Sequence, residues 1–399
     1  MAKILISLVG TGKIINDGES KSYKRTDYSL NDKLYNESFV ANAIIKHYQI
    51  NKLFFIGTNV SMWDEIGNTF DVDDNICTLC YEKQNSKSLA EDDLIPLAEA
   101  IDRKLGQKGS KCIIIKEGCD NDELWETFER FIEILDTIDD SDELYLDITH
   151  LFRSISVMAL VMSEFGLSYK RFKIKGVFYG QLNSEKSPII DLSVFFEFLE
   201  YSKAIRDLKL YGNGHSLNEL LKNSNESKEI KDSFEDFSCA LSVADMGAMQ
   251  QSIKNIKGQI KTFGESKNPI IKIISKQLFP FIKRFDTNAS LSKFQFTLAE
   301  WYAENSNYAM AYITLVEAII SVKCEAEKKD SENKNNRKEV KKELFDNPIY
   351  KASFTEVDKI RNNIAHKIST NSTNKYPKSS PKKSISDFKK YLSYFKRIG

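Results

Sequence analysis

Residues 146–154 read LDITHLFRS, and along this short stretch the pattern changes from that of a buried strand to that of a helix. The apolar run Glu143–Ile148 predicts the strand, and the segment Ile155–Glu164 predicts the helix that follows it. In an open parallel sheet, ligands bind at the carboxyl ends of strands, next to the starts of helices. The stretch therefore predicts an α/β fold with a binding crevice at this step.

The rest of the first half repeats this alternation of strands and helices. Four more apolar runs predict strands: Lys3–Val9, Lys52–Ile56, Lys111–Lys116 and Arg171–Tyr179. Between them lie segments with apolar residues at three-and-four spacing, which predict helices: Phe39–Tyr48, Asp92–Leu105 and Glu123–Thr137. Strands separated by helix-length segments form crossover units and a mainly parallel sheet. We therefore expect a Rossmann-like α/β domain over residues 1–200.

From about Leu192 onward the strand signals fade and helical patterns follow one another. The candidate helices are Asp191–Leu208, Ser233–Phe263, Ile270–Phe285, Ser290–Glu304 and Tyr308–Glu327. A glycine-rich turn at Tyr211–His215 predicts a junction over residues 201–215, and we expect an all-α domain over residues 216–399.

Two polar segments flank one more predicted helix, which contains residues 361–366. Lys328–Lys342 is dense in charge and asparagine, and Ser369–Lys383 is rich in Ser, Thr, Asn, Lys and Pro. Both are predicted to be mobile surface loops. Their lysines could steer a polyanion toward the helix, although solvated loops of this composition are common. We infer no sequence-specific binding from them.

The composition is that of a soluble globular protein. Of the 399 residues, 41% are hydrophobic and 29% are charged, and Lys plus Arg equals Asp plus Glu at 57 each, so any nucleic-acid site must be local. No signal peptide or membrane helix is predicted, and we expect a cytoplasmic protein. Cys77 and Cys80 are the only close pair among six cysteines, and without a second pair or nearby histidines we expect free thiols and no metal site.

Two loops in the α/β half carry candidate ligand-binding residues. Gly10, Thr11, Gly12 and Lys13 follow the first predicted strand, where glycines let the backbone approach an anion, but neither a dinucleotide fingerprint nor a P-loop is complete. The second loop offers hydroxyl, imidazole and guanidinium groups suited to phosphate, ribose and base edges: Thr149, His150, Arg153 and Ser154. The second loop also fits a simple capped helix start with a salt-bridged arginine.

Near the C-terminus, Arg361 and His366 stand five positions apart in a predicted helix. Five positions advance about 500°, so the side chains lie within roughly 140° of each other around the axis. A guanidinium can hold a phosphate bidentately, and a histidine transfers protons near neutral pH. Asn362, next to the arginine, could hydrogen-bond a phosphate or orient the histidine. The set favours phosphodiester chemistry, and a solvated helix face is the alternative.

Together these motifs resemble the CARF-HEPN ribonucleases associated with type III CRISPR systems. The resemblance rests on Gly10-Thr11-Gly12, on Asp147-Ile148-Thr149-His150-X-Phe152-Arg153 and on Arg361-X4-His366, and it covers most of the chain. The segment from Asn307 through Glu317 to Cys324-Glu325 also resembles the helix that precedes the family's catalytic one. Leu151 and Ser156 depart from the family pattern Thr-His-Gly-Phe-Arg-X-X-Pro, and a side chain at position 151 could narrow the ligand groove.

The resemblance implies a function for each half. An N-terminal CARF domain (1–200) would sense a cyclic oligoadenylate, and a helical HEPN domain (216–399) would cut single-stranded RNA in antiviral defence. It further implies a homodimer, with higher assembly left open, in which two copies of Arg361, Asn362 and His366 form one metal-independent site that uses the ribose 2′-hydroxyl as nucleophile. The activator would be cyclic tetra-adenylate or cyclic hexa-adenylate, bound by residues 10–13 and by Thr149, His150, Arg153 and Ser154.

Two other functions remain open from the sequence. The chain could be a non-catalytic nucleotide sensor whose helical half dimerises or recruits a partner. It could also be a ring nuclease that degrades cyclic oligoadenylate, with Thr149, His150 and Lys13 placing a 2′-hydroxyl for in-line attack.

Overall fold

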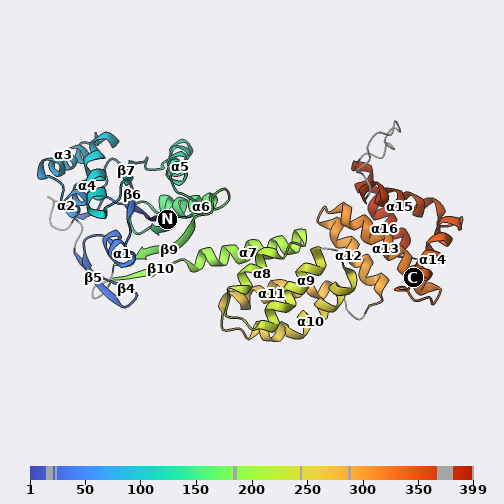
Figure 1. Cartoon of the computed structure of the whole chain (residues 1–399). Helices are drawn as coiled ribbons and strands as arrows, with labels where there is room; N and C mark the ends of the chain where they lie inside the picture. The colour runs from blue at the N-terminus through green and yellow to red at the C-terminus, as the bar shows by residue number, and fades with distance from the viewer. Residues whose placement is uncertain are drawn as a thin grey trace. The chain divides into compact units, whose positions relative to one another are not determined.

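The structure, a computed structural model, describes residues 1–14, 21–22, 25–182, 187–242, 245–285, 289–365 and 381–397. The chain forms two compact units, Met1–Glu197 and Phe198–Gly399 (Figure 1). The predicted junction, 201–215, is occupied by the second part of helix α7 (Val194–Tyr211) and by the turn that leads into helix α8 (His215–Lys222).

The first unit is built on an eight-stranded sheet with the strand order β5-β4-β10-β9-β8-β1-β6-β7. Its strands are β1 (Lys3–Val9), β4 (Thr26–Leu30), β5 (Lys33–Glu37), β6 (Lys52–Gly57), β7 (Lys111–Ile114), β8 (Glu143–Asp147), β9 (Lys173–Gly180) and β10 (Ser187–Asp191). Only the pairs β9–β10 and β4–β5 are antiparallel in this sheet. The predicted mainly parallel sheet is confirmed, and all five predicted strands are present.

Three strands of this sheet, β4, β5 and β10, were not predicted from the sequence. Strands β4 and β5 form a hairpin whose turn residues, Asn31 and Asp32, have φ angles of 47° and 63°. Two consecutive residues with positive φ are the signature of the tight turn that suits a hairpin. Because β4 alternates buried and partly exposed residues, it contains no apolar run, and the turn was the only local signal. A two-stranded ribbon, β2 (Lys13–Ile14) and β3 (Lys21–Ser22), was also not predicted.

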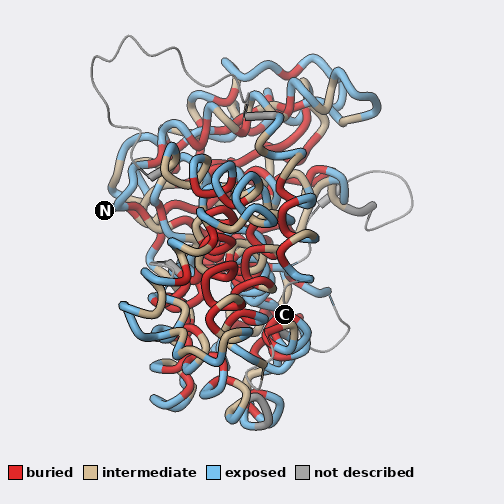
Figure 2. The backbone as a smooth tube through the Cα atoms, turned by 90° about the vertical axis from the view of Figure 1, so that its right-hand side faces the viewer, coloured by how far each residue is buried: buried red, intermediate tan, exposed pale blue. Residues whose placement is uncertain are grey.

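Helices cover both faces of the sheet, because the central strands are apolar on both sides. On β1, Leu5 and Val9 pack into one core and Ile4 and Ile6 into the other. The first core includes side chains of α1 (Val40–Tyr48), α2 (Trp63–Thr69), α3 (Asp74–Asn85) and α4 (Ile95–Leu105). The second includes side chains of α5 (Asn121–Asp136) and α6 (Arg153–Gly166). Figure 2 draws the buried residues in red.

Every element described in the second unit is a helix, as predicted. After α7 and α8 come α9 (Lys228–Ser242), α10 (Met246–Gly264), α11 (Pro269–Arg284), α12 (Leu291–Glu304), α13 (Tyr308–Ala326), α14 (Lys334–Asp346), α15 (Lys351–Ala365) and α16 (Pro381–Phe395). Their apolar faces share one continuous core. Within the described ranges, no helix of either unit is long and apolar enough to cross a membrane.

Two predictions for this unit were wrong. In place of the single helix expected over Ser233–Phe263, the structure has two helices, of which α9 ends at Ser242 and α10 begins at Met246. The loop expected over Lys328–Lys342 contains most of α14 instead. Its N-cap, Asn333, accepts hydrogen bonds from the backbone of the first turn, and Val340 buries an apolar side chain, which together outweigh a charged composition. Of the second predicted loop, residues 369–380 lie outside the described residues and Pro381 begins α16.

Candidate functional site

The two predicted ligand loops of the first unit lie at the same edge of the sheet. Strands β1 and β8 are parallel neighbours, with Ser7 in register with Asp147. The segment 10–13 leaves the carboxyl end of β1, and the segment 149–154 leaves the carboxyl end of β8. The structure thus brings the loops together, and their role as ligand contacts stays a prediction. Lys13 lies in β2, and its side chain is outside the described residues.

A buried carboxylate that was not among the predicted site residues organises this edge. Asp147, 1% exposed, accepts a hydrogen bond from Ser7 Oγ at 2.7 Å and two from Thr149, from the backbone N at 3.1 Å and from Oγ1 at 2.5 Å. Thr149 Oγ1 accepts in turn from the backbone N of Gly180, at 2.9 Å. The hydroxyl of Thr149 therefore holds its own loop against β9. A polar Ser7 within the apolar run of β1 was the available sequence signal.

His150 is held as a neutral imidazole. Its ring meets Phe39 edge-on, with the ring centroids 6.3 Å apart. Burial lowers the pKa of His150, and the nearby Asp147 carboxylate offsets only part of that effect. At neutral pH the imidazole can therefore donate one hydrogen bond to a ligand and accept another. It adds no positive charge to this edge of the sheet.

The start of α6 does not have the features of the alternative interpretation, a capped helix start with a salt-bridged arginine. Phe152 occupies the N-cap and provides no side-chain cap, and Arg153 and Ser154 form the exposed first turn. Arg153 has no ion pair with any residue that the structure describes, so the salt-bridged alternative receives no support there. Leu151 has a φ of 73°, which explains why the family pattern has glycine at this position. A leucine adopts this backbone conformation only at a cost of about 1–2 kcal/mol.

The first loop packs against the segment after β6, and this packing requires a glycine at position 12. Met62 donates its backbone N–H to the carbonyl of Gly10 at 3.0 Å, and Ser61 Oγ donates to the carbonyl of Val9 at 2.7 Å. At Gly12, φ is 68°, and an added Cβ would lie 1.9 Å from Met62 Sδ. The close approach of this loop to Met62 therefore depends on a residue without a side chain.

Replacing Gly12 with alanine should lower the free energy of unfolding by about 2–4 kcal/mol, because backbone strain and overpacking add. Gly106→Ala is the matched control, since Gly106 has a φ of 74° but its added Cβ would have no neighbour within 4 Å. The control should lose only the strain component, about 1–2 kcal/mol. Urea denaturation of both variants measures the difference, and equal losses would contradict the packing argument.

In the second unit, a buried carboxylate joins the predicted catalytic residues of α15. Asp358 accepts hydrogen bonds from Arg361 Nη2 at 2.8 Å, from Asn362 Nδ2 at 2.9 Å and from Lys341 Nζ of α14 at 3.0 Å. Arg361 Nε is buried and has no hydrogen-bond partner among the described residues. His366 lies outside the described residues. The structure therefore fixes Arg361 and Asn362 relative to each other through Asp358.

The charge state of Asp358 follows from its surroundings. Burial acts to raise the pKa of Asp358, but the hydrogen bonds and charges of Lys341 and Arg361 outweigh it and hold the pKa below its ordinary value. The carboxylate is ionised at neutral pH and carries two cationic partners. Sequence reasoning missed Asp358, although its place three and four positions before Arg361 and Asn362 puts all three on one helix face.

The helix predicted to precede the catalytic one is α13, and in the chain α14 lies between α13 and α15. The sequence did not predict α14 because residues 328–342 were expected to form a loop. In space α13 still packs against α15. Its Glu317 pairs with Arg337 of α14, and its Glu325 accepts from the backbone N of Ser292 at 2.9 Å, so both acids connect helices.

No group of three or more potential metal ligands is assembled among the residues that the structure describes. Cys77 and Cys80 are both buried on α3 with free thiols, as predicted. Burial raises the pKa of the Cys80 thiol to about 11, which favours the protonated form at neutral pH.

Segments of both units match families of CRISPR-associated proteins. Residues 4–183 match the family model described as CRISPR system endoribonuclease Csx1, CARF domain. Residues 197–291 match the model described as CRISPR-associated protein MJ1674, second domain. The curated CRISPR-associated protein MJ1674 of Methanocaldococcus jannaschii is 30% identical over 92% of this chain, and the chain spans 62% of the length of that relative.

A search of solved structures adds Enterococcus italicus Csm6 bound to cyclic hexa-2′-fluoro-hexa-dAMP. That alignment covers 100% of this chain and 93% of that chain, with 12% identity and a TM-score of 0.41, a similarity too weak to support an argument. The two family models and the curated relative are all CRISPR-associated, and the predicted CARF resemblance is confirmed over residues 4–183. The first unit therefore contains a domain similar to the CARF domain of CRISPR-associated proteins.

Proposed function

We propose that this chain is an endoribonuclease of type III CRISPR defence, which a cyclic oligoadenylate activates and which cuts single-stranded RNA without a metal. The observation that carries the proposal is the CARF match over residues 4–183, whose loops after β1 and β8 meet at one sheet edge. The arrangement of Arg361 and Asn362 around Asp358 supports a HEPN nuclease in the helical unit. Because the chain spans 62% of its relative, the activity is inferred from these sites.

The proposed reaction is an internal transesterification. His366 takes the proton from a ribose 2′-hydroxyl, and the 2′-oxygen attacks the adjacent phosphorus. Arg361 holds the phosphate and stabilises the developing negative charge. The bond to the 5′-oxygen breaks, and that oxygen receives a proton from an acid, a role for the second copy of His366 in a dimer. The products carry a 2′,3′-cyclic phosphate and a 5′-hydroxyl.

A second copy of the chain is the proposed partner, and α6 offers a surface for it. Val157, Val161 and Phe165 follow one another at four-residue spacing and are 59%, 57% and 45% exposed. Trp125 of α5, 64% exposed, extends this face through its ring contact with Phe128, which in turn meets Phe165. An apolar face of this kind marks an interaction site. Because α6 begins at the ligand loop, pairing through it would place two loops side by side for one symmetric activator.

Changing Val161 to aspartate should shift the chain from dimer to monomer, because the dimer would have to bury an unpaired carboxylate. The dimer dissociation constant should rise at least about tenfold, which corresponds to 1.4 kcal/mol. Analytical ultracentrifugation measures it. Leu34→Asp is the matched control, since Leu34 is 59% exposed on β5, away from this face. A dimer that survives Val161→Asp, or a monomeric wild type, would contradict this interface.

The proposed function is tested by cleavage of a fluorescent single-stranded RNA in parallel reactions without and with EDTA, to which cyclic tetra-adenylate or cyclic hexa-adenylate is added. We expect cutting that requires one of the two activators and leaves 2′,3′-cyclic phosphate ends. Absence of cutting with both activators would favour the non-catalytic sensor. Loss of the cyclic activator itself in the same reactions, measured by chromatography, would reveal ring-nuclease activity. Loss of cutting on addition of EDTA would overturn the metal-independent mechanism.

A further inference from the structure

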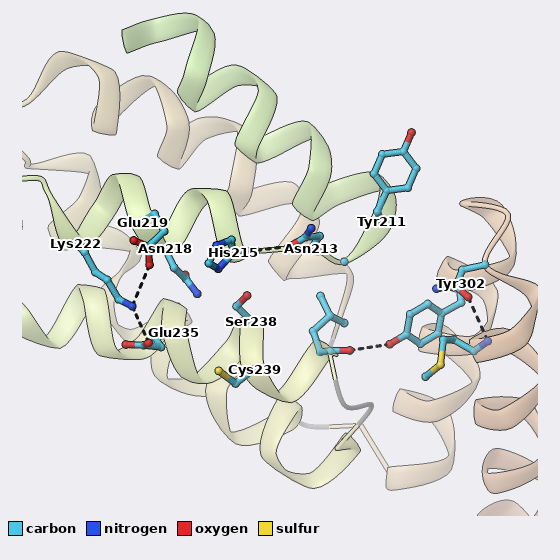
Figure 3. Close-up of a pocket in the computed structure, with 15 residues that line it drawn as sticks. Tyr211, Asn213, His215, Asn218, Glu219, Lys222, Glu235, Ser238, Cys239 and Tyr302 are labelled. Atoms are coloured by element: carbon cyan, nitrogen blue, oxygen red, sulfur yellow. Dashed lines mark hydrogen bonds and ion pairs between the residues drawn. The ribbon is translucent and has the colours of Figure 1, made fainter. Parts of the chain in front are cut away.

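A polar cavity of about 380 Å³ lies in the helical unit, and the residues that line it include none of the predicted site residues (Figure 3). Its walls come from α8 and the turn that leads into it, from α9, and from α12 and the start of α13. Its floor carries two buried polar side chains, Asn218 and Ser238, which are 9% and 7% exposed. The volume is in the range of small-molecule binding sites, and the position falls mainly within the region matched by the second-domain model.

Asn218 indicates that a ligand belongs in this cavity. Its Oδ1 atom is buried and has no hydrogen-bond partner among the described residues. Figure 3 shows its side chain directed into the space between α8 and α9, on the side of Ser238. Native structures rarely leave a buried amide oxygen unpaired. A ligand that offers an N–H donor would satisfy it.

The charges around the cavity disfavour an anion. Lys222 Nζ lies 3.0 Å from Glu235 Oε1 and 3.2 Å from Glu219 Oε1, so two carboxylates face one ammonium. At the start of α8, the backbone N–H of His215 is already donated to Asn213 Oδ1 at 3.0 Å. Free carboxylate or phosphate groups would meet net negative charge here. The charges therefore disfavour anionic ligands, and the unpaired Asn218 oxygen favours a ligand with an N–H donor.

We propose that this cavity binds an adenine base, with Asn218 hydrogen-bonded to its edge. A side-chain amide offers one acceptor and one donor side by side, which matches the amino group and ring nitrogen of adenine. His215, exposed at the rim, can stack on the base. The base can come from a free nucleoside or from single-stranded RNA, and only the second source rests on the proposed function.

Calorimetric titration of the full chain with adenosine, inosine and AMP tests the proposal. Inosine has a carbonyl oxygen in place of the amino group, so beside N7 it offers the Asn218 oxygen no N–H donor and should bind about 5- to 150-fold more weakly than adenosine. AMP should also bind more weakly than adenosine, because its phosphate meets Glu219 and Glu235. Equal binding of adenosine and inosine, or no binding of either, would overturn the proposal without any variant.

Asn218→Leu should abolish adenosine binding and leave binding of cyclic oligoadenylate at the CARF domain unchanged, which separates the two sites. Asn223→Ala, a change at the C-cap of the same helix and outside the cavity lining, should bind adenosine as the wild type does. A 2′-O-methyl oligoadenylate strand, which cannot be cut, distinguishes the sources: binding that depends on Asn218 assigns the cavity to RNA, and its absence assigns the cavity to the free nucleoside. Adenosine binding that persists in Asn218→Leu would place the base elsewhere and overturn the proposal.

Discussion

Replacing His366 with alanine should lower the rate of activated RNA cleavage by a factor of about 10² to 10⁴, the usual contribution of a general acid or base. Arg361→Ala should cause a loss of similar order, because the developing charge on the phosphate would lose its guanidinium partner. Single-turnover cleavage of a fluorescent RNA at saturating activator measures both. Under these conditions the measured rate is that of the chemical step, and differences in substrate binding do not contribute to it.

The matched control for the histidine is His47→Ala. His47 lies on α1, and its Nδ1 atom forms a hydrogen bond with the hydroxyl of Tyr35 at 2.8 Å. It should have no part in cleavage. Binding of the activator should be unchanged in His366→Ala, because the CARF unit is separate. Cleavage by His366→Ala at the wild-type rate would show that the catalytic assignment is wrong, even if activator binding is confirmed.

Replacing Asp358 with alanine should lower the free energy of unfolding by about 3–5 kcal/mol, the cost of breaking a buried ion pair from one side. The change leaves Lys341 and Arg361, whose side chains are 31% and 23% exposed, without their shared carboxylate. Urea denaturation measures the loss. Cleavage should also fall in Asp358→Asn, which keeps the shape and one acceptor, since Arg361 would lose the charge that positions it.

The stability difference between wild type and Asp358→Asn should depend on pH. The pKa of Asp358 is lower in the folded chain than the ordinary value of 3.8, so its stabilising effect is fully present above that value. As the pH falls through the folded pKa, the carboxylate gains a proton and the contribution is lost. The two proteins should therefore converge in stability below about pH 4. A difference that grows on acidification would contradict the ion-pair assignment.

Local patterns in the sequence were enough to predict the main elements of the first unit. All five predicted strands formed, and the apolar runs of three of them, β1, β6 and β8, are buried on both faces of the sheet. The hairpin β4–β5 was missed because neither of its strands contains an apolar run. In the second unit, α14 was missed because its composition is highly charged and its stability comes from a cap and from contacts with other helices.

The sequence by itself determined the fold class, the CARF resemblance and the loops that carry the candidate ligand-binding residues, because these depend on short-range periodicity and contiguous motifs. Only the tertiary structure decided which side chains meet. Asp147 reaches Ser7 across 140 positions of sequence, and Asp358 joins Lys341 of another helix to Arg361. The cavity at Asn218 likewise exists only because α8, α9 and α13 pack together. Such contacts arise from long-range packing, which no local pattern of residues encodes.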